Sequence, residues 1–437
     1  MKHYDCHCHV FNFLTIGWRA VIQSLDGIAA LKPETKLKAV SEKETAKERK
    51  RLLTNIKQYV RVARTLKASS RRLAIRLDNH YKRNGNFGKD VALFPLMFDG
   101  DHLLKASDVG AALDVLRFIE KTKSDFDAEQ RSISAMADAT GLELELAGNL
   151  KELKAHFAEL ESLNTRRGKE RRQDGFARQL EELREIKNMR RFRNRVFPFL
   201  GVDPRRPDIK QYLRQVGKGK FFAGVKIYAP NGFSPTDPVL YGPDSVFEFC
   251  SKNNIPVIAH ASYGGFATPV MRVDVNGYVM SPNSNTPVEH KGAYHFKSGL
   301  ANGFKVMVKE RARALNHPLI WRKALEKYCN LILVMGHFGN GSDEWKQEIA
   351  GLMNDFPNVY TDISCMSEKE ELTAVKTFMD NDHVVRDKVL YGSDFFLEAF
   401  FNPSFKAYVD SIRNVLDSKL LKKISTENPA AFRRLWY

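Results

Sequence analysis

The sequence predicts an α/β fold, a (β/α)8 TIM barrel with helical insertions after strands one and two. Eight short apolar runs, rich in β-branched and aromatic residues, have the length of strands. The later runs alternate with helical patterns, as the strands of a parallel sheet covered by helices do. A doubly wound sheet is the alternative, but no glycine-rich phosphate turn follows an early run.

The predicted strands lie in runs that are each followed by polar, glycine or proline residues. In chain order these runs are 2–11, 91–97, 196–203, 221–228, 255–260, 331–337, 358–364 and 388–394. Helical patterns separate the later runs, at 243–254, 318–329, 344–356 and 403–421. We therefore expect a single barrel domain over residues 1–437.

The first predicted strand carries four potential metal ligands in the stretch MKHYDCHCHV. Side chains alternate between the two faces of a strand, which groups Asp5, His7 and His9 on one face. Cys6 and Cys8 share the other face, where cysteine packs as a small apolar side chain. A structural zinc site is disfavoured. The cysteines of such sites are usually separated by about two to four residues and are joined by a second pair of ligands, whereas Cys6 and Cys8 are separated by one residue and the other cysteines are scattered singly. We expect both cysteines in the core, and Asp5, deeper than His7, in a structural role.

Three segments do not fit a compact barrel. Residues 20–85 and 124–190 are predicted to be charged helical insertions, which are usually solvated faces supported by pairs of opposite charge. The alternative is a surface for an acidic partner or for another copy of the chain. The third segment, 261–316, is long and irregular and follows strand five. We expect it to form a lid and specificity loop over the barrel mouth.

The balance of charge bears on the partners of the protein. The chain has 69 lysine and arginine against 52 aspartate and glutamate residues, a formal net charge of +17. This excess raises nucleic acid or an anionic small-molecule substrate as partners. Nucleic acid is not favoured, because no nucleic-acid-binding motif is present, although the basic charge keeps it open. Homo-oligomerisation is also open.

Localisation is predicted from what the sequence lacks. No apolar run approaches the roughly 20 residues of a membrane helix. The five cysteines show no disulfide framework, and a polar strand begins where a signal peptide would lie. We therefore expect a cytoplasmic protein with no membrane partner.

Metal-binding side chains recur at the carboxyl ends of the predicted strands, where barrels carry their chemistry. Strand one ends in His7 and His9, strand five in His260, strand six in His337 and strand eight in Asp394. Any one of these histidines alone is more simply a core or capping residue. Together, at one end of one barrel, the five side chains favour a metal site.

Each of these residues has an expected role around a divalent ion. His7, His9 and His260 are the expected ligands, since neutral imidazole suits zinc and similar ions. Asp394 is the expected ligand and general base, and His337 the acid–base or polarising group. The ion would lower the pKa of a bound water toward neutrality, so that hydroxide can attack a carbonyl carbon.

The strand-end motifs resemble the amidohydrolase superfamily. They are D-x-H-x-H at 5–9, G-V-K-I-Y at 224–228, A-H-A-S at 259–262, M-G-H-F-G-N at 335–340 and Y-G-S-D at 391–394. Within the superfamily they are most similar to the amidohydrolase-2 group, which includes aminocarboxymuconate-semialdehyde and resorcylate-type decarboxylases. The segments FPLMFD, PFLGVDPRR and STENPAAFRRLW are similar to parts of that group as well. The resemblance covers residues 1–12, 91–101 and 196–437.

The resemblance gives Lys226 two alternative roles. In two-metal members of the superfamily a strand-four lysine is carbamylated and bridges both ions, whereas one metal suffices in the amidohydrolase-2 group. We expect one ion, Zn²⁺ first and Mn²⁺ or Fe²⁺ as alternatives, with an unmodified Lys226 that binds a substrate anion. Tyr228 is a further expected substrate contact. Asp362 on strand seven is a candidate for supporting a ligand or contacting the substrate.

The expected activity is metal-dependent hydrolysis of a small amide, ester or lactone that bears an anionic group. Non-oxidative decarboxylation of an aromatic or muconate-type acid at the same site is one alternative. A TatD-like metal-dependent nuclease is a second, but that group has a glutamate on strand four where this chain has Lys226. A partner-binding protein on a barrel scaffold is a third.

Overall fold

A computed structural model describes residues 2–11, 57, 68–83, 90–99, 148–149, 151–152, 155, 175–299 and 302–437. Most of the two predicted insertions, 20–85 and 124–190, therefore lies outside the described residues. The parts that are described include helix α4 (Ser70–Arg83) in the first insertion and helix α7 (Gly175–Asn188) in the second.

Each of the eight predicted runs contains a strand. These strands are β1 (His3–Cys8), β2 (Val91–Pro95), β3 (Phe199–Val202), β4 (Gly224–Ile227), β5 (Val257–His260), β8 (Leu333–Gly336), β9 (Val359–Asp362) and β10 (Val389–Leu390). Strands β3, β4, β5, β8, β9 and β10 form one parallel sheet in that order, and β1 pairs with β2 in parallel. The last run is paired as a strand over two residues only, and residues 391–394 that follow form a loop.

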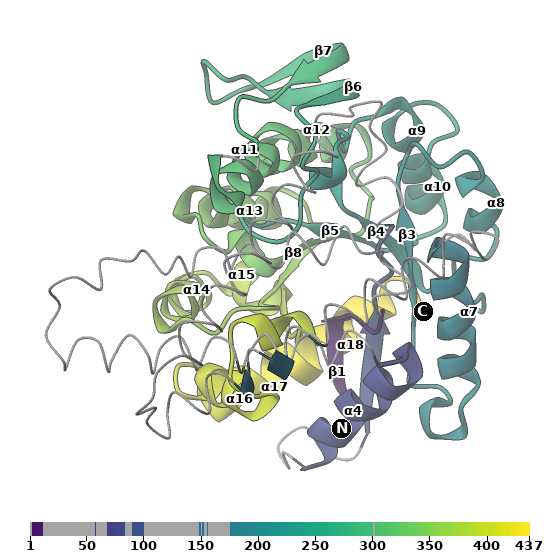
Figure 1. The fold of residues 1–437 in the computed structure, drawn as a ribbon, viewed down its shortest axis with the longest axis vertical. Coiled ribbons are helices and arrows are strands. Elements are labelled where there is room, and N and C mark those ends of the chain that lie inside the picture. The colour runs from purple at the N-terminus through teal and green to yellow at the C-terminus, as the bar shows by residue number, and fades with distance from the viewer. Residues whose placement is uncertain are drawn as a thin grey trace, which may run out of the picture.

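Backbone contacts join the two parallel sheets at both ends. Parallel bridges link Leu93 to Val196 and Leu96 to Phe199, which connects β2 to β3. On the other side the Cys6 amide donates to the Tyr391 carbonyl at 2.9 Å, which connects β1 to the end of β10. The eight strands therefore follow one another in chain order around a ring, as the (β/α)8 prediction requires. Figure 1 shows them at the centre, with helices outside.

Helices occupy the connections between the strands. They are α8 (Ile209–Leu213), α9 (Pro238–Tyr241), α10 (Val246–Lys252), α12 (Pro318–Lys327), α13 (Asp343–Asp355), α14 (Lys369–Asn381), α15 (His383–Lys388), α16 (Phe405–Arg413), α17 (Ser418–Lys422) and α18 (Asn428–Arg434). The prediction of one helix over 403–421 is wrong, because the side chain of Asp417 accepts from the Leu420 amide and starts α17 as a new helix. Among the described helices, none has the length and apolar character of a membrane span.

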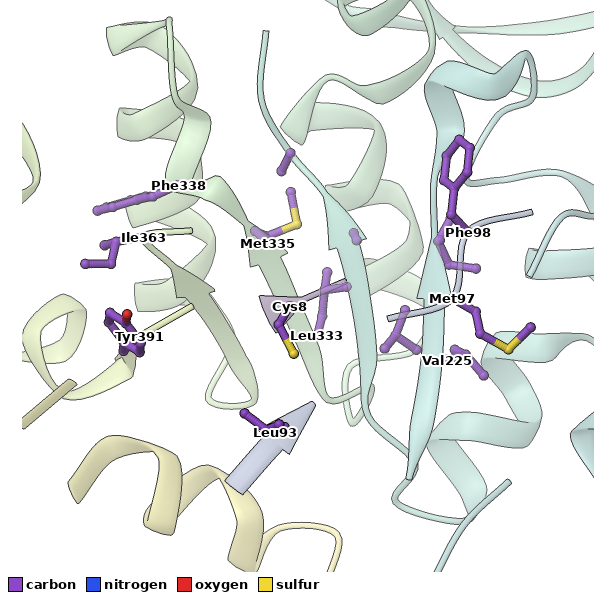
Figure 2. Packing of buried hydrophobic residues seen from close by; sticks show 14 of the residues in the cluster. Cys8, Leu93, Met97, Phe98, Val225, Leu333, Met335, Phe338, Ile363 and Tyr391 are labelled. Atoms are coloured by element: carbon purple, nitrogen blue, oxygen red, sulfur yellow. The ribbon is translucent and has the colours of Figure 1, made fainter. Parts of the chain in front are cut away.

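Two apolar clusters sit on the two faces of the barrel wall. The inner cluster takes residues from every barrel strand except β4, including Cys6, Phe94 and Leu390, and Trp436 closes it near the C-terminus. The outer cluster lies between strands and helices, and Figure 2 shows Cys8 there in the same cluster as Leu333. Both cysteines are buried in apolar surroundings, as the sequence predicts. They lie on different faces of the barrel wall, so the prediction that Cys6 and Cys8 share a face is wrong.

Strand β1 does not alternate strictly between these two faces. His3 and Asp5 pair with Val91 and Leu93, but Cys8 pairs with Pro95, so β1 contains one extra residue between Asp5 and Cys8. Such a bulge turns two successive side chains to the same side. Cys6 belongs to the inner cluster, and His7 next to it also points into the barrel.

Asp5 consequently lies on the opposite side from His7, and the prediction that they share a face is wrong. Its carboxylate accepts from the Tyr81 hydroxyl of α4 at 2.7 Å and from the Ser393 hydroxyl at 2.6 Å. The structural role predicted for Asp5 agrees with these contacts.

The prediction that 261–316 is irregular is also wrong. This segment contains an antiparallel hairpin, β6 (Arg272–Met280) and β7 (Pro287–His295), and the helix α11 (Phe304–Asn316). Buried Val273, Val275 and Val279 pack with Leu315 of α11, which supplies the apolar face that stabilises the hairpin. Alternation of apolar and polar residues at 273–276 is the sequence signal for this strand.

Gly224 at the start of β4 provides a test of the packing inside the barrel. A Cβ at this position would lie 2.4 Å from the Phe199 ring and 2.4 Å from the Pro256 carbonyl oxygen. Gly224→Ala should therefore lower the free energy of unfolding by about 1–3 kcal/mol, measured by denaturant titration.

Gly351, inside α13, offers a matched control. A Cβ on this residue would come no closer than 3.8 Å to another group, the Arg322 side chain. Gly351→Ala should raise the free energy of unfolding by about 0.5–1 kcal/mol, since alanine is the better helix former. Equal effects of the two substitutions would contradict this account of the barrel interior.

Candidate metal centre

The strand-end residues singled out in the sequence gather at one end of the barrel. His7 and His9 come from β1 and its end, His260 from β5, His337 from the turn after β8, and Asp394 from the loop after β10. All five side chains are buried. Lys226 of β4 is buried beside them, and Tyr228 follows on the same strand end.

Three of these residues bring their ligand atoms together. One nitrogen of each of His7 and His9 and a carboxylate oxygen of Asp394 lie within 4.8 Å of one another. Asp394 Oδ1 is 3.1 Å from His9 Nε2 and 3.6 Å from His7 Nε2. Two ligand atoms bound to one tetrahedral zinc ion lie roughly 3.3–3.5 Å apart, so the observed separations fit a shared ion.

The other nitrogen of each imidazole is fixed by an acceptor. His7 Nδ1 lies 2.8 Å from Asp362 Oδ2, and His9 Nδ1 lies 3.0 Å from the Leu96 carbonyl oxygen. A carbonyl accepts only, so Nδ1 of His9 carries the proton and donates it. In both neutral imidazoles the lone pair is then on Nε2, directed toward the Asp394 side. Ligand histidines in metalloproteins are oriented in this way.

The charges and lone pairs of His7, His9 and Asp394 favour a bound cation. Burial and the neighbouring Lys226 lower the pKa of His7 to about 3, which keeps its ring neutral. Among the described residues, Asp394 Oδ1 has no hydrogen-bond partner. A buried anionic oxygen facing nitrogen lone pairs is an arrangement that a divalent ion satisfies.

His7, His337 and Asp362 form a second group with ligand atoms within 4.8 Å. In this group Asp362 has little capacity left for a metal. Its Oδ2 accepts a hydrogen bond from His7 Nδ1, and its Oδ1 accepts from the His337 and Ser364 amides at 3.0 Å each, and from the Ser364 hydroxyl. Asp362 therefore holds ligand-bearing residues in place, which agrees with one of the two roles that the sequence suggested.

His337 stands at the centre of the imidazole group. Its ring lies 4.6 Å from that of His7 and 4.7 Å from that of His260, between centroids. Its Nδ1 contacts the Ser364 carbonyl at 3.1 Å and the Ser364 hydroxyl at 2.9 Å. Donation to the carbonyl leaves Nε2 of the neutral ring free to act on a substrate.

His260 is close to the group but belongs to neither set of three. Its Nε2 lies 2.9 Å from the Gly264 carbonyl and 3.1 Å from the Ser262 hydroxyl. Donation to that carbonyl leaves Nδ1 as the only nitrogen available to a metal. The structure therefore brings His7, His9 and Asp394 together more closely than the predicted ligand His260.

Tyr228 is tied to the loop after β5. Its hydroxyl donates to the Phe266 carbonyl at 2.9 Å and accepts from the Phe266 amide at 2.7 Å. Its ring stacks on His260 with centroids 4.4 Å apart. These contacts fix the loop and the His260 ring, so the hydroxyl is engaged by the protein itself.

Lys226 is a buried amine next to the group. Its Nζ lies 3.4 Å from His7 Nε2, and it forms no ion pair within 4 Å with a described carboxylate. Burial lowers the pKa of Lys226 to about 8, against the opposing charges of Asp362 and Asp394. The amine is thus available to an incoming anionic group.

Two glycines of the strand-end motifs leave room for His7. A Cβ on Gly336 would lie 3.0 Å from the His7 ring, and one on Gly392 would lie 2.6 Å from the His7 Cβ. Positive φ occurs close to both glycines, 70° at His337 and 51° at Asp394. Non-glycine residues rarely adopt it, and where they do the site is often functional.

Several supporting residues were not identified in the sequence. Ser364 and Ser262 contact His337 and His260, and Asn316 donates to the His260 carbonyl at 2.7 Å. Ser364 lies two residues after Asp362, and both residues contact His337. This spacing is visible in the sequence, so the role of Ser364 could have been predicted. Asn316 lies at the end of α11, and nothing in its local sequence connects it with the site.

Comparisons with known proteins bear on the family of the chain. The family model described as Amidohydrolase matches residues 143–435, more than half of the chain. No curated protein matches the chain.

Solved structures similar to this chain include two dihydroorotases and one amidohydrolase 2. The dihydroorotase of Saccharomyces cerevisiae, in complex with 5-fluoroorotic acid, is 14% identical, with 59% of this chain and 72% of that chain covered and a TM-score of 0.36. The dihydroorotase of Campylobacter jejuni is 16% identical, with the same coverage and a TM-score of 0.34. Amidohydrolase 2 of Bifidobacterium longum subsp. infantis is 13% identical over 58% of this chain and 74% of that one, with a TM-score of 0.33. On the extent of the family match, the chain belongs to the amidohydrolase family.

Proposed function

We propose that the protein is a metal-dependent hydrolase that acts on a small amide, ester or lactone. The observation that carries the proposal is the buried group of His7 Nε2, His9 Nε2 and Asp394 Oδ1, whose spacing and donor atoms suit one divalent ion. Zn²⁺ is the first candidate for that ion, with Mn²⁺ and Fe²⁺ as alternatives. Membership of the amidohydrolase family supports the reaction class.

Each residue of this group and around it has a separate proposed role in hydrolysis. When bound, the ion would lower the pKa of a water and polarise a carbonyl oxygen. Asp394, a buried carboxylate beside the proposed ion, is the proposed acceptor of a proton from the attacking water. His337, with Nδ1 held by Ser364, presents Nε2 to the substrate oxygen or leaving group. His260, buried nearby, is the proposed additional ligand through Nδ1.

The environment of Lys226 favours a substrate with a negative charge. The residue is 2% exposed, and its amine has no carboxylate partner within ion-pair distance among the described residues. A buried ammonium without a counter-ion is costly, and a substrate carboxylate or phosphate would relieve that cost. The substrate is therefore proposed to carry such a group close to the bond that is hydrolysed.

The first test is an activity screen with small lactones, cyclic amides and esters, each with and without a carboxylate. Protein loaded with Zn²⁺, Mn²⁺ or Fe²⁺ should hydrolyse at least one anionic member, and Asp394→Asn should lower kcat/KM by about 10²- to 10⁴-fold. Asp355→Asn, at an exposed ion pair with Arg322, is the matched control and should leave the rate unchanged.

The same screen separates the alternatives. Aromatic and muconate-type acids should be followed for release of carbon dioxide, and single- and double-stranded DNA for cleavage. Carbon dioxide release without hydrolysis would replace the hydrolase with a decarboxylase at the same group. Metal-dependent DNA cleavage would favour the nuclease, and no turnover of any kind would count against an enzyme of this type.

Asp362 should tune metal affinity without being a ligand. Asp362→Asn removes the charge behind His7 Nδ1, so the affinity for Zn²⁺ should fall by about 10- to 100-fold in competition with a chromophoric chelator. Asp380→Asn, on the exposed face of α14, is the control and should not change it. Unchanged affinity in Asp362→Asn would contradict the role given to this carboxylate.

Substitution of Lys226 tests whether the site holds one metal ion or two. Lys226→Met should keep one metal per chain and should raise KM for anionic substrates by about tenfold or more, since a charged contact to the substrate is lost. Neutral analogues should be affected less. If elemental analysis instead shows two ions in the wild type and fewer in Lys226→Met, the lysine is a metal bridge and the anion-binding role is wrong.

A further inference from the structure

The hairpin of β6 and β7 lies on the outside of the molecule, with β7 on its outer side (Figure 1). It is held at several points. The Ser234 hydroxyl donates to the Tyr278 carbonyl at 2.7 Å, and the Tyr278 amide donates to the Thr236 hydroxyl at 2.6 Å. Near its tip, Asn285 bonds to Glu344 of α13. The hairpin is therefore a fixed element.

The register shows which backbone groups of β7 face outward. Ser281 donates to the Thr286 carbonyl and Phe296 to the Met271 carbonyl, on the pairing line that joins β6 to β7. Hydrogen-bonded pairs alternate along an antiparallel ladder. Residues 288, 290, 292 and 294 of β7 therefore bond to β6. Residues 287, 289, 291, 293 and 295 direct their backbone groups to the outer edge.

The two edges of the hairpin differ in what covers them. The outer edge of β6 is contacted at Tyr278 by Ser234 and Thr236. On β7, no backbone hydrogen bond from the outward amides of Glu289 or Lys291 to another described residue is found. Glu289 and Lys291 are exposed, and so is Val288 at 42%. An exposed edge of this kind is a template for pairing with another strand.

From this edge we infer that the protein forms a symmetric dimer in which β7 pairs antiparallel with β7 of a second copy. A two-fold axis at His290 places Glu289 opposite Lys291 of the partner subunit, and Lys291 opposite Glu289 of the partner subunit. Both residues direct their backbone groups outward, so each pair exchanges two backbone hydrogen bonds. Both pairs also join opposite charges across the strands, which stabilises a sheet.

The charges select this register. If the axis passed through Lys291 instead, two lysines would face each other, and like charges directly opposite are destabilising. A lone lysine on an edge strand opposes pairing, but Glu289 two residues away turns the same strand into a self-complementary one. The pattern matches a second copy of this chain better than an arbitrary extended peptide.

Three neighbouring residues fit the same axis. Ala293 would face Pro287 of the partner subunit, which has no amide proton to offer. The Ala293 carbonyl already contacts the His290 ring at 3.2 Å, so it needs no strand donor. Exposed Val288 would face Gly292 of the partner subunit, and a Cβ on Gly292 meets nothing within 4 Å. The valine therefore has room to lie across the partner strand.

Charge exchange tests the dimer directly. Wild-type protein should sediment as a dimer over a concentration series. Glu289→Lys and Lys291→Glu should each raise the dissociation constant by roughly tenfold or more, because each places like charges opposite one another. The double variant Glu289→Lys with Lys291→Glu should restore the dimer, since it recreates both pairs with the charges exchanged.

A backbone variant and a charge control complete the test. Lys291→Pro removes an outward amide that β6 does not use, so it should abolish the dimer while circular dichroism shows a folded protein. Lys252→Glu, which changes the same charge on α10, should leave the dimer intact. A monomeric wild type, single variants that dimerise like the wild type, or a folded double variant that stays monomeric would each overturn the inference.

Discussion

The candidate site depends on one extra residue in β1. Strict alternation would place Cys6 and His7 on opposite faces of the barrel wall, but the bulge between Asp5 and Cys8 turns both inward. Cys6 then packs in the apolar inner cluster. His7 lies at the end of the barrel that holds the candidate metal ligands, where its Nε2 is 3.6 Å from Asp394 Oδ1. Without the bulge, His7 would lie on the outer side together with Asp5. Glycine at 336 and 392 is the matching requirement, because His7 occupies the space that a Cβ would take.

Hydrogen bonds between β1 and the loop after β10 link this bulge to the Asp394 carboxylate. The Asp394 amide donates to the His7 carbonyl at 2.7 Å, and the Ser393 amide donates to Asp5 Oδ1 at 2.9 Å. The Asp394 loop is thereby held directly against the strand that carries His7 and His9. Tyr81 of α4 bonds to Asp5 from outside, and α4 lies outside the residues matched by the amidohydrolase family model. A helix that is not part of the matched family region thus supports the site through one buried carboxylate.

The strands and the strand-end residues could be predicted from the sequence because both are local signals. Apolar runs predict buried parallel strands, and histidine or aspartate at their ends is visible without knowing the fold. The bulge could not be predicted, because it depends on how β1 pairs with β2. The roles of Ser364 and Asn316 escape prediction for a similar reason, since each acts on a histidine distant in sequence. In the hairpin at 272–295, length and glycines indicate irregular structure more strongly than the alternation over its first strand indicates a sheet.

The most direct measurement of the central claim is anomalous diffraction at the zinc edge from crystals of metal-loaded protein. The account predicts one strong peak, about 2.0–2.2 Å from His7 Nε2, His9 Nε2 and a carboxylate oxygen of Asp394. Asp362 should stay outside bonding distance and keep its contact with His7 Nδ1. A peak bound through Asp362, through Cys6 or Cys8, or the absence of any peak at the barrel mouth would contradict it.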